Sequence, residues 1–291
     1  MFNLPHLTIQ QRWLVVGEEF GIADRNVVIT GAASGIGRAM AQRFVEYGSI
    51  VHILDSNETE AERTAQFLEG GSHRPQYAAC DVTDASSYAR ILNQIDRECG
   101  GIDVMIHNAG IPQKPLKIHE VDAETAKKIV GVNSMGVLYG TQIVTPLMIG
   151  HGGGVQLYTS STASTIGMED RAIYDATKHF VDGLIQSCAI DYAPDNVRFV
   201  GIAPGRVRTP FVNKMLKDRP ELREVLENTA GVWGRMMEPE EIADVAVFAA
   251  SKMARAITGV TIGVGGFENG MNLSGLYRKG VERGRQMGPH T

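Results

Sequence analysis

Cysteine is scarce in this sequence: Cys80, Cys99 and Cys188 are the only three among 291 residues, and they lie far apart. Their spacing matches no pattern of a metal site or a redox pair, so we expect reduced thiols, no bound metal and a cytoplasmic location. Long apolar runs are also missing. The run Trp13–Val16 is too short for a signal peptide, and no stretch approaches the ~20 residues of a membrane span. We therefore expect a soluble protein without a membrane partner.

Positive charge is not in excess either. The chain carries 28 lysines and arginines against 33 aspartates and glutamates, a formal net charge of −5. A nucleic-acid surface needs a basic stripe, so this balance argues against a nucleic-acid partner. Linkers, repeats and low-complexity tracts are missing as well. With 43% hydrophobic and 21% charged residues, the chain has the composition of a globular protein with a sizeable core.

Short segments rich in β-branched residues alternate with longer amphipathic segments. The predicted strands are Val27–Thr30, Ile50–Asp55, Tyr77–Asp81, Val104–Asn108, Val155–Thr159, Val197–Ile202 and Val260–Val264. The predicted helices are Ile36–Tyr47, Glu58–Leu68, Ala85–Cys99, Ala123–Ile149, Ile173–Tyr192 and Glu238–Met253. Several strands are apolar on both faces, as expected where helices cover both sides of a parallel sheet. We predict the α/β class: a single-domain, Rossmann-type doubly wound sheet of about seven parallel strands flanked by helices.

Some segments lie outside this alternation. We expect residues 1–25 to form an N-terminal extension, residues 26–266 the α/β domain, and residues 267–291 a C-terminal tail. Phe211–Trp233 is predicted to be an insertion with one or two short helices. In the tail, apolar residues at helical spacing predict that Phe267–Tyr277 is ordered, although a solvated tail is the alternative.

A glycine-rich turn follows the first predicted strand. Gly31, Gly35 and Gly37 are spaced Gly-x-x-x-Gly-x-Gly and lead into a helix. Glycines let backbone N–H groups approach a pyrophosphate, and the helix N-terminus favours its negative charge. A tight strand-to-helix connection is the alternative, but the position at the start of the alternation favours a nucleotide site.

The second strand ends in Asp55, where a carboxylate can accept hydrogen bonds from the adenosine ribose and would repel a 2′-phosphate. Its neighbours Ser56 and Asn57, and Ser34 in the glycine loop, bring no positive charge. Arg38 is the one residue here that could favour a phosphate. The sequence therefore predicts NAD rather than NADP.

Further along the chain come Ser161, Tyr174 and Lys178. A tyrosine and a lysine four residues apart project from one face of a helix. A free tyrosine titrates near ~10, and an adjacent ammonium group brings its pKa toward the working range of a general base. Ser161 could hydrogen-bond the same substrate oxygen. The alternative is an incidental surface pair, because Tyr-x-x-x-Lys by itself is a weak signal.

Together these motifs resemble the short-chain dehydrogenases/reductases of the single-domain type over about residues 25–266. Thr30–Gly37 resembles the family's cofactor loop, Asp81-Val82 its adenine contact, and Asn108-Ala109-Gly110 its strand-4 motif. Tyr174–Lys178 resembles the active-site helix, with Ser161 at a common spacing, and Pro204–Thr209 resembles the nicotinamide loop. The cofactor residues that this resemblance implies are Gly31, Ser34, Gly35, Ile36, Gly37, Asp55, Asp81, Val82, Asn108, Ala109, Gly110, Tyr174, Lys178, Pro204, Gly205, Val207 and Thr209.

The resemblance implies a hydride transfer between NAD and an alcohol or ketone. Tyr174 would be the acid/base, Lys178 would hold the nicotinamide ribose and lower the tyrosine pKa, and Ser161 would orient the substrate oxygen. Asn133 would hold a water of the proton relay. His107 stands where an asparagine is common and is expected to be structural.

The substrate pocket is expected to be mostly apolar. Its candidate residues are Ile111, Ala163, Met168 and the stretch Phe211–Met215, with Arg171 as a possible anchor for an anionic group. The substrate is expected to be a small molecule, and two long helices rich in apolar surface favour a homo-oligomer, with a tetramer first. A 3-oxoacyl-carrier-protein reductase and a non-catalytic NAD sensor remain as alternatives.

Overall fold

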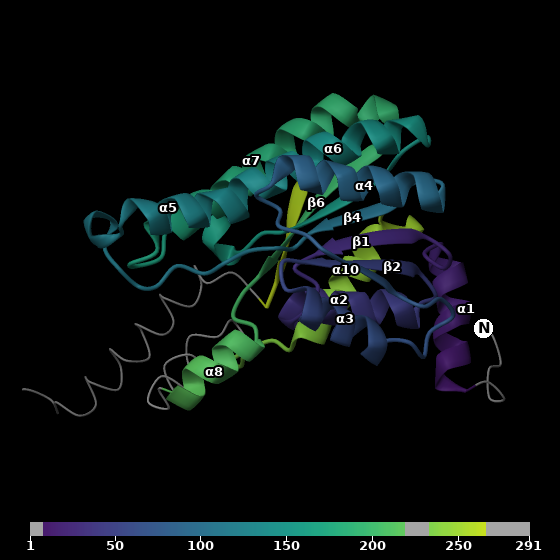
Figure 1. Cartoon of the computed structure of the whole chain (residues 1–291), viewed down its shortest axis with the longest axis horizontal. Coiled ribbons are helices and arrows are strands. Elements are labelled where there is room, and N and C mark those ends of the chain that lie inside the picture. The colour runs from purple at the N-terminus through teal and green to yellow at the C-terminus, as the bar shows by residue number, and fades with distance from the viewer. Residues whose placement is uncertain (1–7, 219–232, 266–291) are drawn as a thin grey trace, which may run out of the picture.

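The computed structural model describes residues 8–218 and 233–265 (Figure 1). Seven parallel strands form one sheet in the order β3-β2-β1-β4-β5-β6-β7. The strands are β1 (Asn26–Thr30), β2 (Ile50–Asp55), β3 (Gln76–Ala79), β4 (Val104–His107), β5 (Gly154–Thr159), β6 (Val197–Pro204) and β7 (Val260–Val264). The predicted fold class is therefore confirmed. Two predicted strands match at both ends, and the ends of the others differ by at most two residues.

Helices cover both faces of the sheet (Figure 1). One face carries α2 (Gly35–Glu46), α3 (Glu58–Phe67) and α10 (Pro239–Ala250). The other carries α4 (Ala85–Cys99), α6 (Gly136–Gly150) and α7 (Ala172–Tyr192). Strand side chains alternate between the two layers, because Val27 and Ile29 belong to one core while Val28 belongs to the other. No helix among the residues described is long and apolar enough to cross a membrane.

The order of the strands creates a crevice. The chain winds outward from β1 to β3, returns to β4 beside β1, and then winds in the opposite direction. Val27 pairs with Val51 of β2 on one side and with Val104 of β4 on the other. In sheets of this kind a ligand site lies at the carboxyl ends of the strands where the winding reverses. The glycine turn after β1 and the motif after β4 both lie at that edge.

The predicted helix over Ala123–Ile149 is confirmed, but it contains a π-helical turn that was not predicted. The segment consists of α5 (Ala123–Val130), a π-helical turn (Gly131–Met135) and α6. Such turns insert one extra residue and are frequent at functional sites. Here the turn contains the buried Asn133. Apolar periodicity could not reveal it, since the pattern continues through the bulge.

The predicted N-terminal extension contains a helix, α1 (Ile9–Phe20). Thr8 and Gln11 cap its first turn reciprocally, and Trp13 packs on Tyr47 with ring centroids 5.1 Å apart. In the predicted insertion, α8 (Pro210–Asp218) is the part that the structure describes. Residues 219–232 and the tail, including the segment Phe267–Tyr277 that is predicted to be ordered, lie outside the described residues.

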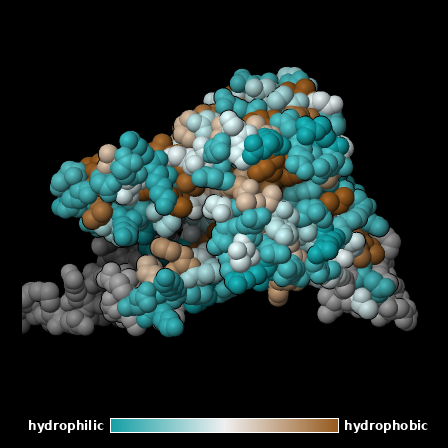
Figure 2. Space-filling model, in the orientation of Figure 1, coloured by the Kyte–Doolittle hydropathy of each residue, from teal (hydrophilic) through white to brown (hydrophobic). Residues whose placement is uncertain are grey.

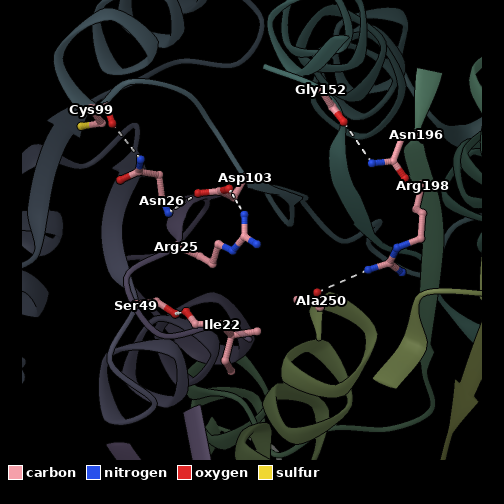
Figure 3. Close-up of polar contacts among 10 residues, drawn as sticks. All are labelled: Ile22, Arg25, Asn26, Ser49, Cys99, Asp103, Gly152, Asn196, Arg198 and Ala250. Atoms are coloured by element: carbon pink, nitrogen blue, oxygen red, sulfur yellow. Dashed lines mark hydrogen bonds and ion pairs between the residues drawn. The ribbon is translucent and has the colours of Figure 1, made fainter. Parts of the chain in front are cut away.

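The amino ends of the strands are closed by structural hydrogen bonds (Figure 3). Arg25 pairs with Asp103, and Asn196 Nδ2 donates to the carbonyl oxygen of Gly152 at 3.0 Å. Arg198 donates to Ala250 O, one of several carbonyl groups at and beyond the C-terminal end of α10 that it binds. An arginine at a helix C-terminus satisfies carbonyls that lack partners in the helix. The side chains of Arg25 and Arg198 therefore hold parts of the fold together at this edge of the sheet.

Candidate functional site

A cleft of about 770 Å³ opens at the carboxyl edge of the sheet. Its walls include Lys128 of α5 and Phe211 of α8, and the surface is hollowed between these two helices (Figures 1 and 2). Most of the predicted site residues line it: Gly31, Ser34, Gly35, Ile36, Asp55, Asp81, Val82, Asn108, Ala109, Gly110, Ser161, Tyr174, Lys178, Pro204, Gly205, Val207 and Thr209. Gly37 and Asn133 lie outside the lining. Seven separate segments of the chain thus meet at one place.

The glycine turn depends on two special positions. Gly31 has φ of 63°, a conformation that favours glycine. Gly37 lies beneath the loop, where an added Cβ would stand 2.3 Å from Gly31 O and 2.5 Å from Asn108 Nδ2. Gly37 therefore acts indirectly: it lets the start of α2 pack directly against the loop backbone.

Asp55 lines the cleft at the end of β2 and braces the same loop. Its Oδ2 accepts from the backbone N–H of Ala33 at 3.1 Å, and its Oδ1 accepts from that of Asn57 at 3.0 Å. Arg38, the cation closest to this motif in sequence, lies with its guanidinium 4.6 Å from the ring centroid of Phe67 on α3 and is not part of the lining. The carboxylate therefore faces the cleft while Arg38 is occupied elsewhere.

Asn108 ties three strand ends together beneath the cleft. Its Nδ2 donates to Thr30 O at 3.0 Å and to Gly31 O at 3.1 Å, and its Oδ1 accepts from Thr159 Oγ1 at 3.0 Å. The carboxyl ends of β1, β4 and β5 are thereby held in a fixed relation. Fixed strand ends beneath the cleft would keep a bound nucleotide in one position relative to the other cleft residues.

Tyr174 and Lys178 lie one turn apart on α7, as predicted. The Lys178 side chain is buried; its Nζ donates to Thr159 O at 2.7 Å and lies 5.7 Å from the ring centroid of Tyr174. Burial lowers the pKa of Lys178 to about 8, and the carboxylate of Asp182 opposes this shift. A cation in a low-dielectric position interacts strongly with a developing phenolate nearby.

Ser161 begins the short 3₁₀ turn that follows β5. Its Oγ accepts from Ala163 N at 3.1 Å, and the residue is 9% exposed and lines the cleft. Its neighbour Ser160 donates to Asp182 Oδ1 at 2.7 Å, so the Ser160 hydroxyl has a structural partner. Ser161 keeps its O–H available for a further acceptor, because this hydroxyl serves Ala163 only as an acceptor.

Asn133 is buried in the π-helical turn and is held by the loop after β4. Ile111 N donates to Asn133 Oδ1 at 2.8 Å, and Asn133 Nδ2 donates to Ile111 O at 3.0 Å and to Thr177 Oγ1 at 3.3 Å. The side chain thus joins the β4 loop to α7. Its part in a proton relay stays a prediction.

Three histidines, His107, His151 and His179, have structural partners. His107 Nε2 lies 2.9 Å from Gln156 Oε1, and burial lowers the pKa of His107 to about 4, against the effect of this hydrogen bond. His107 is therefore neutral at physiological pH. His151 pairs with Asp96, and His179 contacts Asp175 O. Within the described part of the chain, no group of three or more histidine, cysteine or acidic side chains could hold a metal ion.

The loop that contains Pro204, Gly205, Val207 and Thr209 is braced by Met237. Arg208 N donates to Met237 O and Met237 N donates to Arg206 O, both at 2.8 Å. The backbone of Met237 thus fixes the course of this loop, and the side chains of Met236 and Met237 are buried.

The expected substrate pocket is only partly reproduced. Ile111 and Phe211 line the cleft, whereas Ala163, Met168 and Arg171 do not. Arg171 points its Nη1 at Met168 Sδ, 3.8 Å away. Two residues that the sequence did not single out, Lys128 and Val132, line the cleft from α5 and the π-helical turn. Val132 could have been predicted, because it directly precedes Asn133, which the sequence did single out.

Comparison with known proteins places this arrangement in a family. A family model described as enoyl-(acyl carrier protein) reductase matches residues 31–268. The chain is 33% identical over 251 residues to the cis-4-hydroxycyclohexanecarboxylate dehydrogenase of Sinomonas cyclohexanicum, covering 86% of this chain and 98% of that protein. It is 32% identical over 250 residues to the 3alpha-hydroxysteroid dehydrogenase of Mediterraneibacter gnavus, covering 84% and 97%.

Among solved structures, the 3-ketoacyl-(acyl-carrier-protein) reductase from Brucella melitensis complexed with NADH aligns with a TM-score of 0.78 at 30% identity. The match covers 85% of this chain and 99% of that one. The chain belongs to the short-chain dehydrogenase/reductase family. The predictions of this family and of an oxidoreductase acting on CH–OH groups are thereby confirmed.

Proposed function

We propose that the protein is an NAD-dependent dehydrogenase of small secondary alcohols, with Tyr174 as acid/base. The observation that carries the proposal is the pair formed by Tyr174 and the buried Lys178 ammonium, in one cleft with Ser161. A buried cation beside a phenol has a chemical purpose, since it stabilises the phenolate that takes the proton of an alcohol.

The residues of the cleft fit a dinucleotide. The glycine turn presents its backbone to the cleft at Gly31 and Gly35, where N–H groups can meet a pyrophosphate, and Asp55 offers a carboxylate to a ribose. With Arg38 engaged by Phe67, this end of the cleft favours NAD over NADP. When bound, NAD supplies hydride acceptance or donation at its nicotinamide ring.

The chain's own groups then handle the proton and the orientation. In oxidation, the Tyr174 phenolate removes the hydroxyl proton of the substrate, and the Ser161 hydroxyl donates to the same substrate oxygen. Lys178 stabilises the phenolate electrostatically and would hold the nicotinamide ribose. Asn133 holds the Ile111 backbone in place, and we propose that a water beside it passes the proton to solvent.

A ring-bearing secondary alcohol is the substrate class that we propose. Two relatives are named for hydroxyl groups on alicyclic rings, and the apolar residues Ile111, Pro112 and Phe211 share the cleft with Tyr174. The test is steady-state turnover of cyclohexanol-type alcohols, hydroxysteroids and acyclic secondary alcohols with NAD. If the protein oxidises none of these alcohols, the proposal is contradicted.

A carrier-linked reductase is the second candidate, because the Brucella neighbour carries that name. That neighbour is complexed with NADH, so cofactor preference alone does not separate the two functions. A 3-oxoacyl group on an acyl carrier protein should be turned over far less efficiently than a free cyclic ketone. The reverse ratio would establish the second candidate, and binding of NADH without any turnover would favour a sensor.

We also propose a cytoplasmic homotetramer in which residues 26–266 form the dinucleotide-binding and catalytic domain. Phe180 and Ile190 of α7 are 40% and 79% exposed, and apolar side chains on long helices commonly mark subunit contacts. The cysteines at 80, 99 and 188 are free, as suits a reducing compartment. A monomeric mass in light scattering at micromolar concentration would contradict the oligomer.

A further inference from the structure

Helix α7 holds Tyr174 in its first turn but lacks a cap of its own. Its N-cap residue is Arg171, whose side chain has no acceptor and makes no capping hydrogen bond. The first N–H groups of a helix need acceptors, which serine, threonine, aspartate or asparagine at this position usually provide. In this chain the acceptor comes from another loop: Gln113 Oε1 accepts from Ile173 N at 3.1 Å and from Tyr174 N at 3.0 Å.

The amide of Gln113 is fully used. The residue is 5% exposed, and its Nε2 donates to Asp170 O at 3.3 Å and to Leu116 O at 3.5 Å. Two N–H donors therefore face its oxygen and two carbonyl acceptors face its nitrogen. If the amide were flipped, its NH₂ group would face the two N–H donors and its oxygen would face the two carbonyl oxygens. The partners therefore fix the orientation of the amide.

These contacts fasten three segments around the phenol. Asp170 has φ of 60°, a conformation that costs energy for a residue other than glycine, and its carbonyl also accepts from Leu116 N at 3.0 Å. Gln113 thus joins the loop after β4, the loop before α7 and the first turn of α7. Two residues earlier, Ile111 is held by Asn133. The loop after β4 is therefore held at two places: by Asn133 of the π-helical turn and by the first turn of α7, which contains Tyr174.

We propose that Gln113 is a positioning residue: its amide caps α7 and fixes where the Tyr174 phenol meets the substrate oxygen. The inference rests on the proposed function in taking Tyr174 as the acid/base. Gln113 itself is not part of the cleft lining. It acts through the backbone of Tyr174.

Two substitutions separate positioning from general stability. Gln113→Leu removes both the acceptor and the donors, so the first turn of α7 loses its cap. Gln113→Glu keeps an acceptor for Ile173 N and Tyr174 N, but its second carboxylate oxygen replaces the Nε2 donor and faces the carbonyl oxygens of Leu116 and Asp170. It also adds a negative charge beside the first turn. A nearby carboxylate disfavours a phenolate, so the pKa of Tyr174 should rise. The neighbouring charged residues Arg171, Asp175 and Lys178 are unchanged in both variants, so a difference in the Tyr174 pKa comes from position 113.

The experiment measures turnover, NADH affinity and the titration of the phenol. We expect Gln113→Leu to lower kcat at least about tenfold while the Kd for NADH stays within about threefold, because a shift of the reacting group affects chemistry more than cofactor binding. Gln113→Glu keeps the cap of α7 but loses the contacts of Nε2, so it should recover part of the kcat that Gln113→Leu loses, with the acid limb of its pH profile moved upward. Gln94→Leu, which removes an exposed amide from α4, is the control and should leave kcat unchanged.

The titration of Tyr174 needs no substrate. The tyrosinate difference spectrum between each protein and its Tyr174→Phe version isolates this phenol, and we expect a higher midpoint in Gln113→Glu than in the parent. An unchanged midpoint, or a kcat of Gln113→Leu within threefold of the parent, would overturn the inference. If Gln113→Leu does not fold, the Gln113→Glu titration decides alone. If no alcohol is turned over, the proposed function fails and the titration still decides on Gln113.

Discussion

Replacing Gly37 by alanine tests whether the glycine turn is the cofactor cradle. The new Cβ would stand 2.3 Å from Gly31 O and 2.5 Å from Asn108 Nδ2, well inside van der Waals contact. Both neighbours must move apart, and this breaks the 3.1 Å hydrogen bond between Asn108 Nδ2 and Gly31 O. One lost hydrogen bond costs roughly 1 kcal/mol and overpacking roughly 1–3 kcal/mol, so the unfolding free energy should fall by roughly 2–4 kcal/mol.

The displaced Gly31 carbonyl also distorts the loop that receives the pyrophosphate. We expect the Kd for NADH, measured by fluorescence titration, to rise at least about tenfold, and the Tm to fall by roughly 4–16 °C. Gly150→Ala is the matched control, because Gly150 is also helical and a Cβ there meets nothing within 4 Å. Its stability should stay within about 0.5 kcal/mol of the parent. If the Kd of Gly37→Ala for NADH is within twofold of the parent value, the glycine turn does not bind the cofactor as proposed.

Three further changes have defined outcomes. Asp55→Ser should lower the NAD-over-NADP ratio of kcat/KM at least about tenfold, and adding Phe67→Ala should lower it further by freeing Arg38; an unchanged ratio would contradict the assignment. Lys178→Met should move the acid limb of the oxidation profile up by at least about one pH unit, whereas Lys127→Met on the exposed face of α5 should not move it. His107 is neutral when buried, so the unfolded chain binds more protons between pH 6.5 and 4. The unfolding free energy should therefore fall as the pH drops through this window, by up to roughly 3 kcal/mol from His107, and His107→Asn should flatten that decline in denaturant titrations.

Local signals in the sequence predicted the sheet and the location of most site residues. A parallel strand buried on both faces gives a short run such as Val27–Thr30, and the carboxyl ends of neighbouring strands must share one edge. Asp55, Asn108 and Ser161 could therefore be placed in one cleft before any contact was known. Their roles in catalysis and cofactor binding stay predictions.

Features made by contacts between distant segments could not be predicted. The π-helical turn around Asn133 interrupts no apolar pattern, so a single helix was predicted there. The cap of α7 comes from Gln113, 60 residues before Ile173 in sequence, and Arg171 at the N-cap position was the only local sign that an outside acceptor was needed. The engagement of Arg38 by Phe67 likewise depends on how α2 and α3 pack.

Removal of one hydroxyl group tests the central claim most directly. Tyr174→Phe keeps the aromatic ring on α7 but removes the proton that the mechanism transfers. We expect its Kd for NADH to stay within about threefold of the parent, while kcat for a secondary alcohol that the parent oxidises falls by about three orders of magnitude or more. A kcat within tenfold of the parent, with cofactor binding intact, would assign the acid/base to another group and contradict the account.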